Sequence, residues 1–260
     1  MSELDLLPGE QLDEVNFQIR LIQKADGLHF GTDALLLASY IKQTPAATAV
    51  EFGGGSGIIS LLCLSRKKVA RVACVEVQEA YASLIGRNAA LNGFSEAMRA
   101  VCCDVRQFAV RGEEQGKADV VFTNPPYMKS TAGAPNGAEE KNIARHEVLG
   151  DIFDFCAAAA RLLRFGGRFY CVYRPDRMAD LLYALRANKL EPKRLTLVHA
   201  DAQTEPSMLL VEAVSGGKCG LCVTRPLLVY QQQAEGKRVY TADMVSVMEH
   251  GVLPQATERG

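Results

Sequence analysis

The chain has 260 residues, of which 48% are hydrophobic and 23% are charged, and its net charge is −1. These values are ordinary for a water-soluble globular protein, and they exclude a globally basic nucleic-acid-binding protein. No apolar run approaches the roughly 18 residues that cross a bilayer, and the acidic segment 1–5 lacks the basic-then-apolar order of a signal peptide. We therefore expect a cytoplasmic protein with one α/β domain and extensions, or with two small domains.

The first 45 residues contain a strand-like stretch at 15–23 and a helix-like stretch that begins at 33, with Thr32 as its candidate N-cap. After Pro45, strand-like and helix-like stretches alternate, which is typical of a mainly parallel sheet with helices on both faces. The expected strands are 47–52, 71–77, 98–103, 118–123, 168–173, 194–199 and 207–214, and the expected helices are 58–64, 79–92, 152–163 and 177–188.

Two segments interrupt this alternation. Residues 128–142 contain Gly133, Pro135, Asn136 and Gly137 and have little to bury, which predicts a mobile loop where a lid over a substrate would lie. The tail from residue 216 predicts added strands or a hairpin at 221–224 and 227–230, and a short helix after Thr241.

The most informative motif is Asn124-Pro125-Pro126-Tyr127, which directly follows the strand expected at 118–123. The two prolines end that strand because neither has an N–H for the ladder. The motif therefore lies at the carboxyl edge of the sheet, where ligands of open α/β sheets bind. The Asn124 side-chain oxygen and the Pro125 carbonyl can accept the two hydrogens of a planar amine and favour a tetrahedral nitrogen. Tyr127 can stack on the flat group that carries the amine.

A glycine-rich turn at 53–57 follows the first expected strand, and acids stand at the ends of successive strands. Glycines allow the backbone to approach a ligand closely, although dinucleotide-binding proteins have such a turn as well. Glu51 could reach an amino group of the ligand, and Glu76 is placed to accept both hydroxyls of a ribose. Asp104 is placed to hold the amino group of an adenine, with Val105 as a flat neighbour.

Together these features resemble the class I S-adenosylmethionine-dependent methyltransferases over about residues 32–214. The resemblance implies an α/β, Rossmann-like, doubly wound, mainly parallel seven-stranded sheet whose last strand is antiparallel, with S-adenosyl-L-methionine as the cofactor. We expect an N-terminal extension at 1–45 that packs on the cofactor site, a methyltransferase domain at 46–215 and a C-terminal extension of it at 216–260. The implied cofactor contacts within the domain are Glu51, Gly53, Gly55, Glu76, Val77, Asp104, Val105 and Asn124.

The segment 27–33 is similar to the stretch that precedes the fold in the tRNA adenine-N6 methyltransferases that act near the valine anticodon, and 18–23 and 144–147 also look like that family. The chain departs from it in having three consecutive glycines in the turn and a cysteine-rich third strand. RNA, and tRNA in particular, is the implied partner. The resemblance adds Phe30, Thr32 and Asp33 as cofactor contacts, and it implies substrate contacts for Pro126, Tyr127, Arg145 and His146.

The motifs and the resemblance together predict an N-methyltransferase for an exocyclic amine, with adenine N6 in tRNA near the anticodon as the first hypothesis and Asn124, Pro125 and Tyr127 as its catalytic residues. The motif would equally serve glutamine N5 of a release factor or guanine N2 of rRNA. A nicotinamide-dependent oxidoreductase would share the sheet, and a non-catalytic RNA-binding module would need no amine-gripping turn. Cys219 and Cys222 form a C-x-x-C pair without a second pair nearby, so we expect no metal site.

Overall fold

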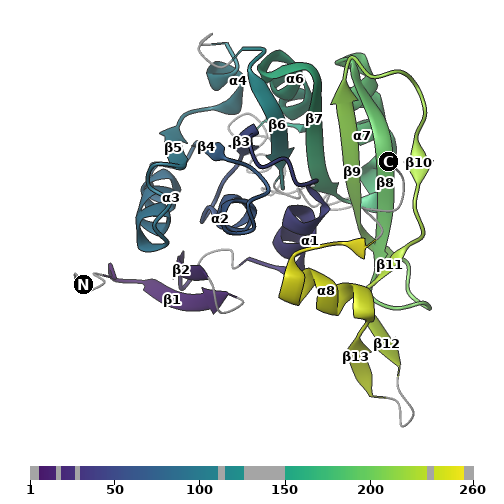
Figure 1. The fold of residues 1–260 in the computed structure, drawn as a ribbon, viewed down its shortest axis with the longest axis horizontal. Coiled ribbons are helices and arrows are strands. Elements are labelled where there is room, and N and C mark those ends of the chain that lie inside the picture. The colour runs from purple at the N-terminus through teal and green to yellow at the C-terminus, as the bar shows by residue number, and fades with distance from the viewer. Residues whose placement is uncertain are drawn as a thin grey trace, which may run out of the picture.

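The computed structural model describes residues 6–15, 19–26, 30–110, 115–125, 150–232 and 237–254 of the chain. Within these residues, the centre of the molecule is a nine-stranded sheet between helices (Figure 1). In order across the sheet, its main strands are β5 (Met98–Cys102), β4 (Arg71–Glu76), β3 (Thr48–Phe52), β6 (Ala118–Thr123), β7 (Leu163–Tyr173), β9 (Pro206–Ser215) and β8 (Leu190–His199). The short strands β10 (Cys222–Val223) and β11 (Leu227–Leu228) both pair with β8.

The strand directions are those of a doubly wound sheet. Strands β5, β4, β3, β6 and β7 are parallel to one another, so crossover connections must join them. Strand β9 is antiparallel to both β7 and β8. The expected mainly parallel seven-stranded sheet with an antiparallel last strand is therefore confirmed, and β10 and β11 widen it.

Helices cover both faces of the sheet and enclose two apolar cores. On one face lie α1 (Thr32–Tyr40), α2 (Ile58–Ser65), α3 (Glu79–Leu91) and α8 (Ala242–His250). On the other lie α4 (Val105–Phe108), α6 (Ile152–Leu162) and α7 (Met178–Ala187), with the one-turn η1 (Pro175–Arg177) before α7. Because the central strands are buried on both faces, their sequences are nearly continuous apolar runs. None of the described helices is long and apolar enough to span a membrane.

Two boundaries near the N-terminus differ from the sequence-based expectations. No strand was expected before residue 15, but β1 (Glu10–Val15) lies there and pairs antiparallel with β2 (Ile19–Lys24). Thr32 does not cap α1, because Gly31 occupies the N-cap position without a side-chain hydrogen bond and Thr32 is the first helical residue.

Strands β7 and β8 are longer than expected, because each contains a Gly or Pro near its start that interrupts the sequence pattern of a strand. Strand β7 begins at Leu163 instead of residue 168, and Gly166 within it adopts a φ of 76°. Strand β8 begins at Leu190 instead of residue 194, and its register against β9 shifts just after Pro192. Gly and Pro are depleted from regular strands, so the sequence pattern placed both starts too late.

The N-terminal hairpin is docked on α3 by two asparagine side chains. Asn88, which is fully buried, accepts a hydrogen bond from Ile22 N at 2.8 Å and donates to Ile22 O at 3.0 Å. Asn92, one turn later, makes the same pair of hydrogen bonds with Arg20 at 2.9 and 2.7 Å. Asn88 also donates to the carbonyl of Ser56 in the glycine-rich turn at 2.9 Å. The hairpin is thereby tied to the turn that follows β3.

The C-terminal extension widens the sheet and then folds back. The strands expected at 221–224 and 227–230 correspond to β10 and β11, which pair with β8 and not with each other. A hairpin of β12 (Tyr230–Gln232) and β13 (Arg238–Tyr240) follows and projects from the body of the molecule beside α8 (Figure 1). The helix expected after Thr241 is confirmed as α8, and the Thr241 side chain caps it by accepting a hydrogen bond from the amide of residue 244 at 3.2 Å.

Candidate active site

The carboxyl ends of the parallel strands β3, β4, β5 and β6 meet at one edge of the sheet. Hydrogen bonds join the neighbouring turns there, because Gly53 N donates to Val75 O at 2.9 Å and Thr123 Oγ1 donates to Phe52 O at 3.1 Å. Asn124 leaves β6 at this edge. Ligands of open α/β sheets bind at this position, so the edge is the candidate site.

The turn after β3 leaves its backbone open. Gly53 and Gly55 adopt φ angles of 67° and 54°, and a Cβ on either would meet no described atom within 4 Å. Gly55 N donates to Glu76 Oε2 at 3.1 Å, and Gln78 N donates to Glu76 Oε1 at 2.9 Å. Glu76 is thus held against the glycine turn while both oxygens keep a free lone pair. This arrangement fits a ligand that carries hydroxyl groups.

Glu51 does not face the open side of the turn, contrary to the expectation that it reaches a ligand amino group. Glu51 is 1% exposed. Its Oε2 accepts a hydrogen bond from the Ser60 hydroxyl, and Cys74 Sγ lies 3.6 Å from the same oxygen. Burial raises the pKa of Glu51 to about 8, so its carboxyl is protonated at neutral pH. It therefore supports the turn from behind, between α2 and β4.

Asp104 follows β5 and is the N-cap of α4. Its Oδ1 accepts a hydrogen bond from Arg106 N at 2.7 Å, and the Arg106 guanidinium binds both carboxylate oxygens, with Nη2 2.5 Å from Oδ2. Hydrogen bonds from Arg106 hold the pKa of Asp104 below its ordinary value. The neighbouring Val105 is buried. An adenine amino group would therefore share this carboxylate with Arg106.

Asn124 is held by one end of its amide. Its Nδ2 donates a hydrogen bond to Asp33 Oδ2 at 2.7 Å. Its Oδ1 is buried and has no hydrogen-bond partner among the described residues. Buried polar atoms are nearly always paired, so this oxygen is the group at the sheet edge that most needs a donor from a ligand. Asp33 was expected to contact the cofactor, and the contact that the structure gives it is Asn124.

The other predicted residues are placed as follows. Phe30 is half-buried against the core beneath α1, and its N donates to Gln23 Oε1 at 3.1 Å. Thr32 is exposed at the start of α1, and Val77 is half-buried after β4. The predicted Pro126, Tyr127, Arg145 and His146, and the predicted lid at 128–142, lie outside the described residues.

Three residues that shape the site were missed from the sequence. Ser60 and Cys74 enclose the Glu51 carboxyl, and the Arg106 guanidinium binds the Asp104 carboxylate. Cys74 is indistinguishable from any small apolar residue of a buried strand. Ser60 carried a usable signal, since it is a polar residue inside the apolar stretch that forms α2. Asp104 carried a signal too, since Asp is a preferred N-cap residue and can mark the start of a helix.

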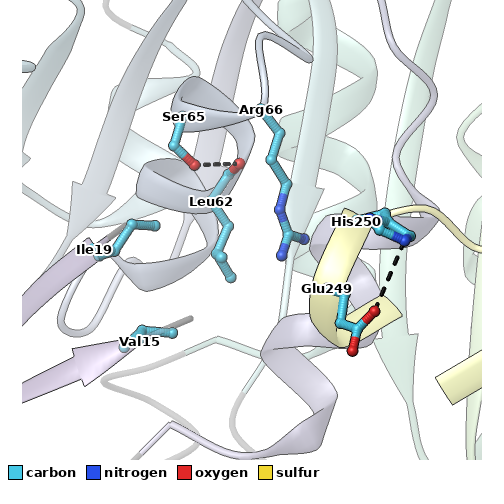
Figure 2. Close-up of a pocket in the computed structure, with 7 residues that line it drawn as sticks. All are labelled: Val15, Ile19, Leu62, Ser65, Arg66, Glu249 and His250. Carbon is cyan, nitrogen blue, oxygen red and sulfur yellow. Dashed lines mark hydrogen bonds and ion pairs between the residues drawn. The ribbon is translucent and has the colours of Figure 1, made fainter. Parts of the chain in front are cut away.

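A separate hollow of about 240 Å³ lies at the far end of α2 from the glycine turn, between the N-terminal hairpin and α8 (Figure 2). In it, Glu249 Oε2 lies 3.8 Å from His250 Nε2. None of the buried unpartnered side-chain atoms among the described residues belongs to its lining, so it is not part of the candidate site. Its lining consists of Val15, Ile19, Leu62, Ser65, Arg66, Glu249 and His250.

The described part of the chain holds no group of three or more His, Cys, Asp or Glu side chains that could bind a metal ion. Cys219 is exposed, Cys222 is partly exposed, and both are free thiols. The candidate site therefore rests on backbone groups, carboxylates and one amide.

Comparison with known proteins agrees with this geometry. The family model described as conserved hypothetical protein 95 matches residues 36–149. A tRNA1(Val) (adenine(37)-N6)-methyltransferase of Porphyromonas gingivalis is 28% identical over 197 residues, which cover 73% of this chain and 76% of the relative. An enzyme of the same name from Enterobacter sp. (strain 638) is 26% identical over 192 residues, with coverage of 73% and 76%.

Solved structures share the fold. A predicted O-methyltransferase from Agrobacterium tumefaciens superposes with a TM-score of 0.66 at 22% identity, over 83% of this chain and 94% of that one. Geranyl diphosphate C-methyltransferase from Streptomyces coelicolor, solved with S-adenosyl-L-homocysteine, superposes with a TM-score of 0.52 at 15% identity, over 71% and 78%.

The strand order, the open glycine turn and the relatives agree on one class, and this protein is a class I S-adenosylmethionine-dependent methyltransferase. The nicotinamide-dependent oxidoreductase that the sheet alone allowed is thereby set aside. Within the class, the chain is similar to the tRNA1(Val) (adenine(37)-N6)-methyltransferases.

Proposed function

We propose that this methyltransferase acts on the exocyclic N6 amine of an adenine in tRNA, near the anticodon. The observation that carries the proposal is the buried Oδ1 of Asn124, which lacks a partner among the described residues and lies where the sheet presents its ligands. An amine N–H is the donor that such an acceptor needs. The names of the curated relatives support adenine 37 of tRNA1(Val) as the target.

The cofactor would lie along the four strand ends. Glu76 would accept the ribose hydroxyls on the lone pairs that its two backbone donors leave free. Gly53 and Gly55 would let the methionine part approach the backbone, and Asp104 would accept the adenine amino group beside Val105. When bound, S-adenosylmethionine supplies an electrophilic methyl group on a positively charged sulfur.

The protein's contribution to the reaction would be alignment and two acceptors. Asn124 Oδ1 and the Pro125 carbonyl would each accept one hydrogen of the substrate amine, which draws the nitrogen lone pair out of conjugation with the ring. Held in this way, the nitrogen would be free to take the methyl group that the cofactor supplies, and the amine would release one proton afterwards. The positive charge that develops on nitrogen strengthens both hydrogen bonds in the transition state.

An RNA loop is a suitable substrate for such a site. An adenine must leave its stack before its amine can reach a sheet edge, and unpaired bases in RNA loops do so at low cost. The net charge of −1 means that phosphate contacts would come from local basic surfaces instead of from overall charge.

The proposal is tested with a transcript of tRNA1(Val) and tritiated S-adenosylmethionine. We expect N6-methyladenosine in the digested nucleosides, and no product from a transcript in which adenosine 37 is replaced by guanosine. Asn124→Ala should abolish turnover and leave the calorimetric affinity for S-adenosylhomocysteine nearly unchanged. Methylation of a release-factor glutamine or of guanine N2, with no product on the tRNA, would refute the proposal.

A further inference from the structure

We infer that Asp33 is a positioning residue that fixes the orientation of the Asn124 amide, an inference that rests on the proposed function. The two residues are far apart in the sequence, and the structure brings Asn124 Nδ2 within 2.7 Å of Asp33 Oδ2. The family resemblance had placed Asp33 beside the cofactor. Its contact with Asn124 gives it a role at the other reactant, the substrate amine.

The chemistry of the pair allows one orientation of the amide. An ionised carboxylate only accepts hydrogen bonds, so Asp33 can hold only the NH₂ end of Asn124. The carbonyl end must then turn away from Asp33, and this Oδ1 is the buried atom without a partner among the described residues. In a flipped amide, the NH₂ group of Asn124 would face the substrate amine. Both groups are hydrogen-bond donors, so no hydrogen bond could form between them. Asp33 thus turns position 124 into an acceptor.

Asp33 is itself held in place. Its second oxygen, Oδ1, accepts a hydrogen bond from Ala34 N at 2.9 Å, so both oxygens are engaged. Asp33 lies in the first turn of α1, where the helix dipole favours a negative charge. The carboxylate therefore has little freedom to rotate away from the amide.

The far end of α1 is anchored as well. Lys68, which is buried, donates to the carbonyls of Ser39 and Ile41 at 2.9 and 2.6 Å. Arg194, also buried, donates to the carbonyl of Tyr40 at 2.7 Å. Three successive carbonyls at the helix end thus meet buried cations, which complement the dipole at this end. Helix α1 is fixed as a rigid support for Asp33.

The arrangement predicts what the site can accept. An acceptor at position 124 favours substrates that present two N–H donors, such as an aromatic amine or a carboxamide. A group that offers only lone pairs would leave Asn124 Oδ1 buried and unpaired, and buried unpaired acceptors cost binding and turnover. Asp33 would therefore contribute to the choice of an amine.

The first test separates an amine role from a cofactor role. We expect Asp33→Ala to lower kcat on the tRNA1(Val) transcript about 100-fold, with less than about threefold change in KM for S-adenosylmethionine. Asp33→Asn keeps one acceptor and should recover part of that loss. Asp243→Ala is the matched control, because Asp243 occupies the first turn of α8 away from the strand ends. Weakened cofactor binding with intact kcat would overturn the inference.

The second test exchanges the two partners. Asn124→Asp places two carboxylates within hydrogen-bond distance, where they would have to share a proton, so its activity should fall steeply as pH rises. In the double variant Asp33→Asn/Asn124→Asp, the amide at 33 donates to one oxygen at 124 and leaves the other as the acceptor. We expect the double variant to exceed Asn124→Asp at least tenfold at pH 8 and to lose the pH dependence. A double variant no better than the single one would overturn the inference.

A substrate-independent measurement distinguishes failure of this inference from failure of the proposed function. In asparagine-¹⁵N-labelled protein, the side-chain NH₂ signals of Asn124, identified by their loss in Asn124→Ala, should be shifted by the carboxylate and should move in Asp33→Ala. Wild-type protein that shows this shift but does not methylate tRNA would refute only the proposed function. Absence of the shift in a folded protein would refute the role of Asp33.

Discussion

Replacing Glu51 by glutamine should remove a pH-dependent loss of stability. Glu51 is 1% exposed, and its carboxyl contacts the Ser60 hydroxyl and the Cys74 thiol. Burial raises its pKa from an ordinary 4.5 to about 8. Glutamine has the same shape, stays neutral at every pH, and still offers an oxygen to the Ser60 hydroxyl.

The direction of the effect follows from the protons bound in each state. Below pH 4.5 the carboxyl is protonated in both the folded and the unfolded state. Between pH 4.5 and 8 the unfolded chain releases the proton and the folded protein retains it, so the free energy of unfolding falls as pH rises. From pH 5 to pH 8 the loss amounts to about 3–4 kcal/mol. A difference of one bound proton changes the free energy of unfolding by about 1.4 kcal/mol for every tenfold change in proton concentration, and the difference is less than one proton at both ends of this range.

The assay is urea unfolding followed by circular dichroism at pH 5, 6, 7 and 8, on wild type and Glu51→Gln. The difference between the two free energies of unfolding cancels the titration of the four histidines, because both proteins contain them. We expect the free energy of unfolding of the variant to rise relative to that of the wild type by about 3–4 kcal/mol across this range. Parallel pH profiles would show that Glu51 is ionised in the folded protein and would refute the reasoning.

Three further substitutions test the site and its supports. Glu76→Ala removes the acceptor next to the glycine turn and should weaken S-adenosylhomocysteine binding about 10- to 100-fold by calorimetry, whereas Glu79→Ala, exposed on α3, should not. Asn88→Ala deletes three hydrogen bonds, two of them buried, and should cost about 2–4 kcal/mol of stability in urea melts. A cost no larger than that of Asn92→Ala, at a more exposed position, would contradict the docking role. Lys68→Met unpairs two carbonyls at the C-terminal end of α1, those of Ser39 and the C-cap Ile41, and should cost about 2–4 kcal/mol of stability. Burial lowers the pKa of Lys68 to about 8 from 10.5. Between these pH values the unfolded chain holds a proton that the folded protein has released, so the free energy of unfolding of the wild type should rise with pH relative to that of the variant.

The sheet and the ligand edge could be predicted because their signals are local. In the sequence, apolar stretches that alternate with glycine-containing turns indicate the parallel strands directly. Asn124 was recognised because two prolines end a buried strand beside it, and Glu76 because it ends the strand that follows the glycine turn. Each of these signals lies within a few residues of the group that it concerns.

The direction of Glu51 could not be predicted, because β3 is buried on both faces. In such a strand the alternation of side chains carries no information about which face is open to a ligand. The partner of Asp104 was missed for a different reason, since the short helix α4 was not expected. Without that helix, Arg106 had no reason to fold back on the carboxylate at its N-cap.

Two polar groups at the strand ends, the Glu51 carboxyl and the Asn124 amide, are accommodated by the protein in opposite ways. Glu51 is enclosed by the protein, loses its charge and faces Ser60 and Cys74 instead of a ligand. Asn124 is satisfied at its nitrogen by Asp33, while its oxygen has no partner among the described residues. A neutral amide whose nitrogen is held by a carboxylate is a more dependable acceptor for an amine substrate than a free carboxylate would be. A carboxylate could take the proton and become a donor, whereas an amide oxygen stays an acceptor at every physiological pH. The chemistry of this edge therefore depends on the pair of residue 33 and residue 124, and not on either residue alone.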